Sequence, residues 1–180
     1  LRVKGLALFS LGRVRQSVEI LEHSFELFVR MKHELSIPVL LMETGMAYNA
    51  IGNYEQAGTA YEKALQIWRR EGNLSWQANL LNNLGVLRLF QGEYEKAVLA
   101  FEDGLICAQR SGYTRMEAFI AIGLGDLYAE LEDFSAAQRN YQHAEEVVQR
   151  MDDRFLLFYL IMAHANLALL QKKAVEARKL

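Results

Sequence analysis

The 180-residue sequence has little cysteine, little proline and no excess of either charge sign. With Cys107 alone, neither an internal disulfide nor a metal site built from several cysteines can form, and a single cysteine among apolar neighbours most often packs as a small hydrophobe. A single proline favours helices, because a helix interior tolerates proline least. The net charge of −2 provides no concentrated basic surface for phosphates, so we expect no direct nucleic-acid partner.

Long apolar runs are also scarce. The most apolar stretch, residues 155–170, is interrupted by His164 and Asn166, whereas a membrane-spanning helix needs about 20 consecutive apolar residues. No signal peptide is visible. We therefore expect no membrane span, no membrane partner and a cytoplasmic protein. Residue 1 is Leu, and both chain ends fall inside the repeats described next, so we also expect a fragment of a longer protein.

What the sequence does contain is a repeat of forty residues. Each unit has a turn position, a bulky residue two places later, and then small, large and small residues at offsets of three, four and three. These offsets place the residues on one face of a helix. The five columns read Gly12, Gly52, Gly92, Glu132; Val14, Tyr54, Tyr94, Phe134; Ser17, Ala57, Ala97, Ala137; Leu21, Tyr61, Phe101, Tyr141; and Ser24, Ala64, Gly104, Ala144.

A second helix precedes each turn and carries Gly at one phase, in the column Gly5, Gly45, Gly85, Gly125 and then Ala165. Gly in a helix interior costs about 1 kcal/mol relative to Ala, so its return indicates close contact between paired helices. The sequence thus predicts an all-α fold in which one domain, residues 1–180, is a stack of antiparallel hairpins. We place them at about 1–31, 38–70, 76–110, 115–150 and, as a partial hairpin, 155–180, with the pattern restarting after Leu170.

These columns resemble those of the tetratricopeptide repeat (TPR) family. Leu84-Gly85 and Leu124-Gly125 match its Leu-Gly pair, and Tyr48 and Tyr128 match the aromatic that follows, whereas Arg88 departs from it. The unit is longer than the common family period of about 34 residues. The resemblance implies a right-handed superhelix, a TPR-like α-solenoid of about four and a half repeats whose first helices line the concave face. Such long units are similar to the repeat regions of large bacterial transcriptional activators (MalT-like and SARP-like signal-transduction ATPases).

The sequence contains no catalytic constellation. The four histidines form no HExxH pair, and neither a nucleophile elbow nor a P-loop is present. We therefore expect no enzymatic activity, no cofactor and no metal site. Trp68 and Trp76 bracket one connection between hairpins. A ligand platform is one interpretation of this pair, but we favour packing of the two rings on each other.

The candidate site is the set of first-helix residues that lie off the packing columns. It combines methionine and aromatic side chains, which adapt to irregular partners, with amides that both donate and accept hydrogen bonds. Asparagine is a poor helix former, so three of them in one helix either bind an extended peptide or bond locally; for Asn83 both interpretations stay open. The candidate ligand or peptide groove comprises Met42, Met46, Asn49, Asn79, Asn82, Asn83, Phe119, Ile122, Asp126, Tyr159, Met162 and Asn166, with Arg2, Leu6, Phe9, Val39 and Val86 in the same phase.

These features predict a non-catalytic module that binds a protein or peptide segment, from another protein or from another domain of the same chain. The resemblance favours the sensor or regulatory region of a bacterial transcriptional regulator. A standalone adaptor or scaffold and a peptide-pheromone receptor are the alternatives. A basic clamp for carboxylates is disfavoured, because Met42, Asn82, Ile122 and Met162 stand where Lys or Arg would be needed. Exposed repeat edges also allow two copies to form a homodimer.

Overall fold

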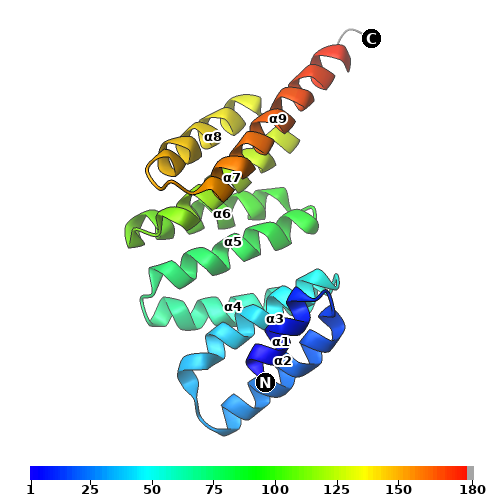
Figure 1. The fold of residues 1–180 in the computed structure, drawn as a ribbon, viewed down its shortest axis with the longest axis vertical. Coiled ribbons are helices and arrows are strands. Elements are labelled where there is room, and N and C mark those ends of the chain that lie inside the picture. Colours follow the sequence, from blue (N-terminus) through cyan, green and yellow to red (C-terminus); the bar gives the residue numbers. More distant parts are fainter. Residues whose placement is uncertain (178–180) are drawn as a thin grey trace.

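In the computed structural model the backbone of residues 1–177 and the side chains of residues 1–172 are described, and over these residues the fold is an all-α superhelix (Figure 1). Successive helices pair as antiparallel hairpins that stack in chain order, with the N-terminus at one end and α9 at the other. The right-handed TPR-like solenoid expected from the sequence is confirmed. The elements are α1 (Arg2–Ser10), α2 (Val14–Arg30), a 3₁₀ turn η1 (Glu34–Ser36), α3 (Ile37–Ala50), α4 (Tyr54–Arg70), α5 (Leu74–Phe90), α6 (Tyr94–Ser111), α7 (Thr114–Glu130), α8 (Phe134–Gln149) and α9 (Arg154–Ala177).

Residues with positive φ recur every twenty positions, at the connection after each helix from α1 to α8. Five are glycines and three are not, and their φ angles lie between 49° and 79°. This left-handed conformation ends a helix and turns the chain back, and glycine adopts it at least cost. The forty-residue repeat is therefore built from two helix-and-turn units of equal length. The eight residues are Gly12, Lys32, Gly52, Gly72, Gly92, Gly112, Glu132 and Asp152.

The glycine column lies where each second helix crosses its first helix. In all four hairpins a large side chain of the second helix covers the glycine so closely that an added Cβ would lie 2.3–2.7 Å from it. The small column beside it is fully buried, and Ser17 also donates its hydroxyl to the Gly5 carbonyl over 2.8 Å. The predicted packing columns are thus observed as contacts. The pairs are Gly5 with Leu21, Gly45 with Tyr61, Gly85 with Phe101, and Gly125 with Tyr141.

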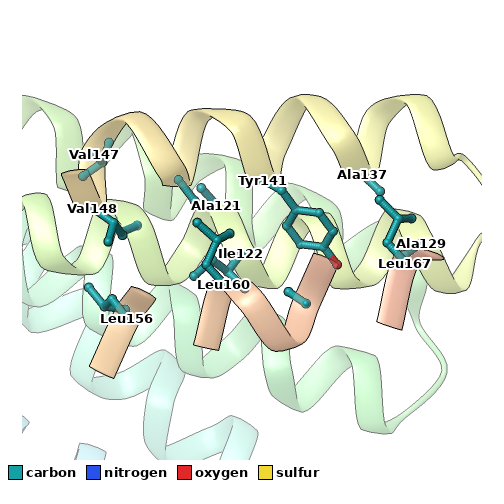
Figure 2. Close-up of a cluster of buried hydrophobic side chains, with 13 residues drawn as sticks. Ala121, Ile122, Ala129, Ala137, Tyr141, Val147, Val148, Leu156, Leu160 and Leu167 are labelled. Atoms are coloured by element: carbon teal, nitrogen blue, oxygen red, sulfur yellow. The ribbon is translucent and has the colours of Figure 1, made fainter. Parts of the chain in front are cut away.

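The core ends in a cluster shared by α7, α8 and α9 (Figure 2). Leu156, Leu160 and Leu167 of α9 pack there with Tyr141 of α8 and Ile122 of α7. Ile122 is 0% exposed. Its prediction as a groove residue is wrong, because α9 lies over the position that the helical phase had assigned to the open surface.

The last helix also differs from expectation. The sequence predicts a new helix after Leu170, but α9 continues without a turn to Ala177 and is the longest helix among the described residues. Where earlier first helices reach Gly12, Gly52, Gly92 or Glu132, this helix has Lys172 between Gln171 and Lys173, and all three residues favour a continued helix. The last three residues of the predicted partial hairpin, 178–180, lie outside the described residues.

The expectation that no segment reaches membrane-spanning length needs correction too. Arg154–Lys172 is 19 residues long with a mean hydropathy of 1.4, enough by length and composition to cross a membrane, and only 22% of it is buried in the fold. His164 and Asn166 interrupt the stretch, but its mean hydropathy stays high enough for a candidate membrane-spanning helix. A core helix of a repeat protein can pass the same test, so length and composition do not place α9 in a bilayer.

Candidate functional site

Three consecutive first helices and one side chain from a second helix form a pocket of about 200 Å³ on the inner face, the surface made by α1, α3, α5, α7 and α9. Met46, Asn49 and Asn83 from the predicted groove meet here, together with Phe9 and Val86 from the same phase. The structure therefore joins α1, α3 and α5 at one place. The wall is apolar along Phe9, Met46 and Val86 and polar at the two asparagines.

Two polar groups of the residues that line this pocket have no side-chain partner among the described residues. The Oδ1 atom of Asn49 is buried and has no hydrogen-bond partner among the described residues. Tyr61, only 1% exposed, lines the pocket with its ring held against Gly45, and no described side chain hydrogen-bonds to its hydroxyl. Burial raises the pKa of Tyr61, so the hydroxyl stays neutral and can donate. The pocket thus holds an acceptor and a donor without a formal charge, and the acceptor is shielded from solvent in this structure.

The C-terminal half of the inner face has a different character. Asp126 accepts a hydrogen bond from the hydroxyl of Tyr141 over 2.6 Å, and Tyr159 lies near the same carboxyl group. Burial raises the pKa of Asp126, although the Tyr141 and Tyr159 hydroxyls act in the opposite direction. Tyr159 and Phe119 lie with their ring centroids 6.2 Å apart and form an aromatic wall beside this carboxyl group. The Asp126 carboxyl group therefore already has a hydrogen-bond donor within the protein itself.

The other predicted residues are spread along the groove. Met42 packs against the core shared by α4 and α5, and Asn79 donates to the Ser75 carbonyl over 3.0 Å, a bond within its own helix. Asn82 is half-buried on α5, whereas Met162 and Asn166 are exposed on α9. Arg2, which shares the groove phase, is held by Glu43 through contacts of 2.5 and 2.7 Å that join α1 to α3. The positive charge of Arg2 is therefore paired with a carboxylate within the fold.

Tyr61 and Tyr141 were missed as inner-face residues, because sequence reasoning assigned them to a packing column. Their rings do pack there, but each hydroxyl reaches beyond the column. The sequence did contain a signal for these two hydroxyls. The same column holds Leu21 and Phe101, which have no polar side-chain atom, so packing alone does not require tyrosine there. A buried tyrosine hydroxyl normally needs a hydrogen-bond partner.

A larger opening, of about 640 Å³, lies on the outer face among α2, α3 and α4, and the sequence did not predict it. Glu22, Glu26 and Glu55 line it together with Lys63. The Tyr48 hydroxyl donates to Glu22, and burial, followed by this carboxylate, raises the pKa of Tyr48 to about 12. Size alone does not make this cleft a better candidate than the inner pocket, because a binding site is recognised by convergent polar groups as well as by its volume.

Two further predictions concern chemistry elsewhere. Trp68 and Trp76 stack on each other at 5.5 Å between centroids and 8° between planes, which confirms the packing interpretation. Across the residues searched, no three His, Cys, Asp or Glu side chains gather closely enough to hold a metal ion.

Comparison with known proteins agrees with this architecture. Residues 36–110, which include α3 to α5 and all but the last residue of α6, match the tetratricopeptide repeat family model. No curated protein matches the sequence.

Three solved structures share the fold. BtubC (BKLC) from P. vanneervenii has a TM-score of 0.74 at 23% identity over 83% of this chain and 62% of its own. Aspartyl phosphate phosphatase F from Bacillus subtilis has a TM-score of 0.80 at 15% identity over 97% of this chain and 49% of its own. The nearly identical TPR-like repeats of a putative kinesin light chain from Podosopora anserina have a TM-score of 0.68 at 15% identity over 99% and 94%. This chain thus spans less than two thirds of the first two proteins.

Proposed function

We propose that this chain is a non-catalytic protein- or peptide-binding module of the tetratricopeptide repeat family and that its inner face is the binding surface. The family match over residues 36–110 supports the class of function, because such repeats bind protein partners. The observation that carries the choice of surface is the pocket of α1, α3 and α5, which Asn49, Tyr61 and Asn83 line and where the buried Asn49 Oδ1 has no hydrogen-bond partner among the described residues. A buried polar atom without a partner is costly unless a ligand or water satisfies it.

The chemistry of the pocket suits a segment of extended polypeptide. The Asn83 amide can both donate to and accept from a backbone peptide group, and the Tyr61 hydroxyl can donate to a carbonyl. Phe9, Met46 and Val86 provide an apolar wall for one uncharged side chain. A charged ligand group would find no counter-ion among these lining residues.

The test is a selection of short linear peptides from a displayed library against the purified chain, followed by affinity measurements by calorimetry. Met46→Glu places a charge at the open edge of the pocket and should weaken selected peptides at least about tenfold, or about 1.4 kcal/mol. Leu99→Glu is the matched control, because Leu99 is an exposed apolar residue of α6 on the outer face. Equal affinity in both variants would place binding elsewhere, with the cleft of α2 and α4 as the next surface to examine.

We further propose that the module acts as the sensor or regulatory region of a larger cytoplasmic bacterial transcriptional regulator. The forty-residue unit and its resemblance to activator repeat regions support this role. A standalone adaptor or scaffold and a peptide-pheromone receptor are the alternatives. A reading frame that also encodes a DNA-binding region and a nucleotide-binding switch would support the regulator, whereas a frame of repeats alone would contradict it.

A further inference from the structure

The opening of about 640 Å³ on the outer face, between α2 and α4, combines apolar walls with an excess of acidic side chains. Its volume is within the range of about 300–1,000 Å³ that ligand sites usually have. Three glutamates line it against one lysine, so negative charge is in excess. We name this opening the outer cleft and define it by Glu22, Glu26, Thr44, Tyr48, Glu55 and Lys63.

The three carboxylates of the outer cleft have no paired cation among the residues that the structure describes. Neither Glu22, Glu26 and Glu55 nor Lys63 takes part in an ion pair with a described residue. Glu22 accepts a hydrogen bond from the hydroxyl of Tyr48, but this hydroxyl is neutral, because burial raises the pKa of Tyr48 to about 12. The fold therefore does not pair the negative charge of the outer cleft.

The next hairpin contains the cation that the outer cleft lacks. Forty residues after Tyr48, Arg88 of α5 forms ion pairs of 3.0 Å with Glu62 of α4 and with Glu93, the residue before α6. Glu62 is the equivalent of Glu22, and α4 and α6 are the equivalents of α2 and α4. One guanidinium thus joins carboxylates at two successive outer helices, and this contact is a template for a ligand of the outer cleft.

Two differences between these hairpins distinguish the outer cleft from the next crossing. Tyr48 stands at the position of Arg88 and brings no positive charge. Thr44 stands at the position of Leu84, which is 7% exposed and packs in the core of α4 and α5. The shorter threonine lines the outer cleft and occupies less of it than a leucine would. The outer cleft therefore has acidic side chains together with room for a cationic group from outside.

We propose that the outer cleft binds an arginine side chain of a partner polypeptide, whose guanidinium has at α2 and α4 the role that Arg88 has at α4 and α6. A planar guanidinium has several N–H donors and can bond carboxylates of both helices at once, whereas a lysine ammonium is a single point charge. The ring of Phe25 lines the cleft and offers a face for stacking, as Phe119 does where the Arg115 guanidinium lies 5.8 Å from its centroid. The outer cleft shares no lining residue with the inner pocket, so this inference does not depend on peptide binding at the inner face.

The proposal is tested by nuclear magnetic resonance titration of the ¹⁵N-labelled chain with the peptide acetyl-Leu-Arg-Leu-amide. The amide resonances that shift should belong to the parts of α2, α3 and α4 around the outer cleft. The same peptide with citrulline in place of arginine keeps the shape and loses the charge, so it should bind at least about fivefold more weakly. Shifts confined to other helices, equal affinity for the two peptides, or no shift at millimolar peptide overturns the proposal.

Variants that remove carboxylates separate the outer cleft from the general acidity of the surface. Glu26→Gln combined with Glu55→Gln should weaken binding of the arginine peptide at least about fivefold, because two exposed carboxylates of the cleft are lost. Glu95→Gln combined with Glu146→Gln is the matched control. These two residues are the exposed equivalents of Glu55 on α6 and of Glu26 on α8, so the net charge changes equally. An equal loss of affinity in the two double variants overturns the proposal in favour of non-specific attraction.

Tyr48→Arg gives the crossing of α2 and α4 the residue that the next hairpin holds. Its guanidinium should occupy the carboxylates as Arg88 does, so the arginine peptide should bind at least about fivefold more weakly. Affinity equal to that of the unmodified chain, with an unchanged circular dichroism spectrum, overturns the proposal. If Tyr48→Arg does not fold, the comparison of the two double variants decides.

Discussion

The ring of Tyr141 lies directly over Gly125, so that a Cβ on Gly125 would stand 2.3 Å from the Tyr141 Cε1 atom. The same ring carries the hydroxyl that donates to Asp126, the next residue of α7. One side chain therefore sets both the separation of α7 from α8 and the environment of a carboxyl group on the inner face.

Gly125→Ala should destabilise the chain by about 2–3 kcal/mol, because the core around Tyr141 has no room to accept the methyl group. Gly123→Ala is a control on the same helix: its Cβ would lie 3.5 Å from Phe101, an ordinary contact, and alanine favours helices. We expect Gly123→Ala to be neutral or stabilising by up to about 1 kcal/mol. Urea denaturation of both variants measures the difference, and equal effects would contradict the assignment of Gly125 to the packing column.

The three non-glycine residues with positive φ provide a second test. Lys32, Glu132 and Asp152 have φ angles of 54°, 60° and 49° at turns where the equivalent positions of other hairpins hold glycine. Replacing each with glycine removes the steric cost of the left-handed conformation but adds disorder to the unfolded chain, so we expect a gain of about 0.5–1 kcal/mol per site. Thermal denaturation checks this, with Lys63→Gly, inside α4, as a control that should lose stability.

Asp126 should make stability depend on pH. Burial raises its pKa above the ordinary value of 3.8, so the folded state binds a proton more tightly than the unfolded chain does. The stabilising contribution is complete below 3.8 and is lost as the pH rises through the folded pKa. The free energy of unfolding of the unmodified chain should therefore fall relative to that of Asp126→Asn across this window and then level off. Parallel pH profiles of the two proteins would show that Asp126 is not held in this environment.

The ion pair of Arg2 with Glu43 should contribute more than an exposed pair, because Glu43 is only 7% exposed. Arg2→Ala leaves this carboxylate without its partner, and we expect a loss of about 1–3 kcal/mol. Arg2→Met combined with Glu43→Met removes both charges and should recover part of that loss. If the double variant is less stable than Arg2→Ala, the carboxylate is not the source of the cost.

Much of this fold follows from the sequence, because a helical repeat contacts mainly its neighbours and the pattern of one unit fixes the next. The glycine and aromatic columns predicted the hairpin contacts, and the first eight helices begin within a few residues of their expected positions. The departures occur at α9. Helical phase gives the direction of a side chain but not what covers it, so Ile122 was assigned to the surface although α9 buries it.

The candidate site was predictable only in part, for a related reason. The positions of Met46, Asn49 and Asn83 follow from the periodicity of the first helices, and these residues do share a pocket. The hydroxyls of Tyr61 and Tyr141 arrive from the second helices, across the pairing that buries their rings. Their reach depends on the distance between helix axes, which composition and spacing do not provide.

The left-handed residue at every twentieth position also constrains how the length of this chain can change. An insertion or deletion of forty residues between two equivalent turns preserves the alternation of inner and outer helices, so the shortened or lengthened chain keeps one continuous groove. A change of twenty residues keeps every turn intact but exchanges the inner and outer helices on one side of it. Gene duplications and deletions in units of forty are therefore the ones that this architecture can accept.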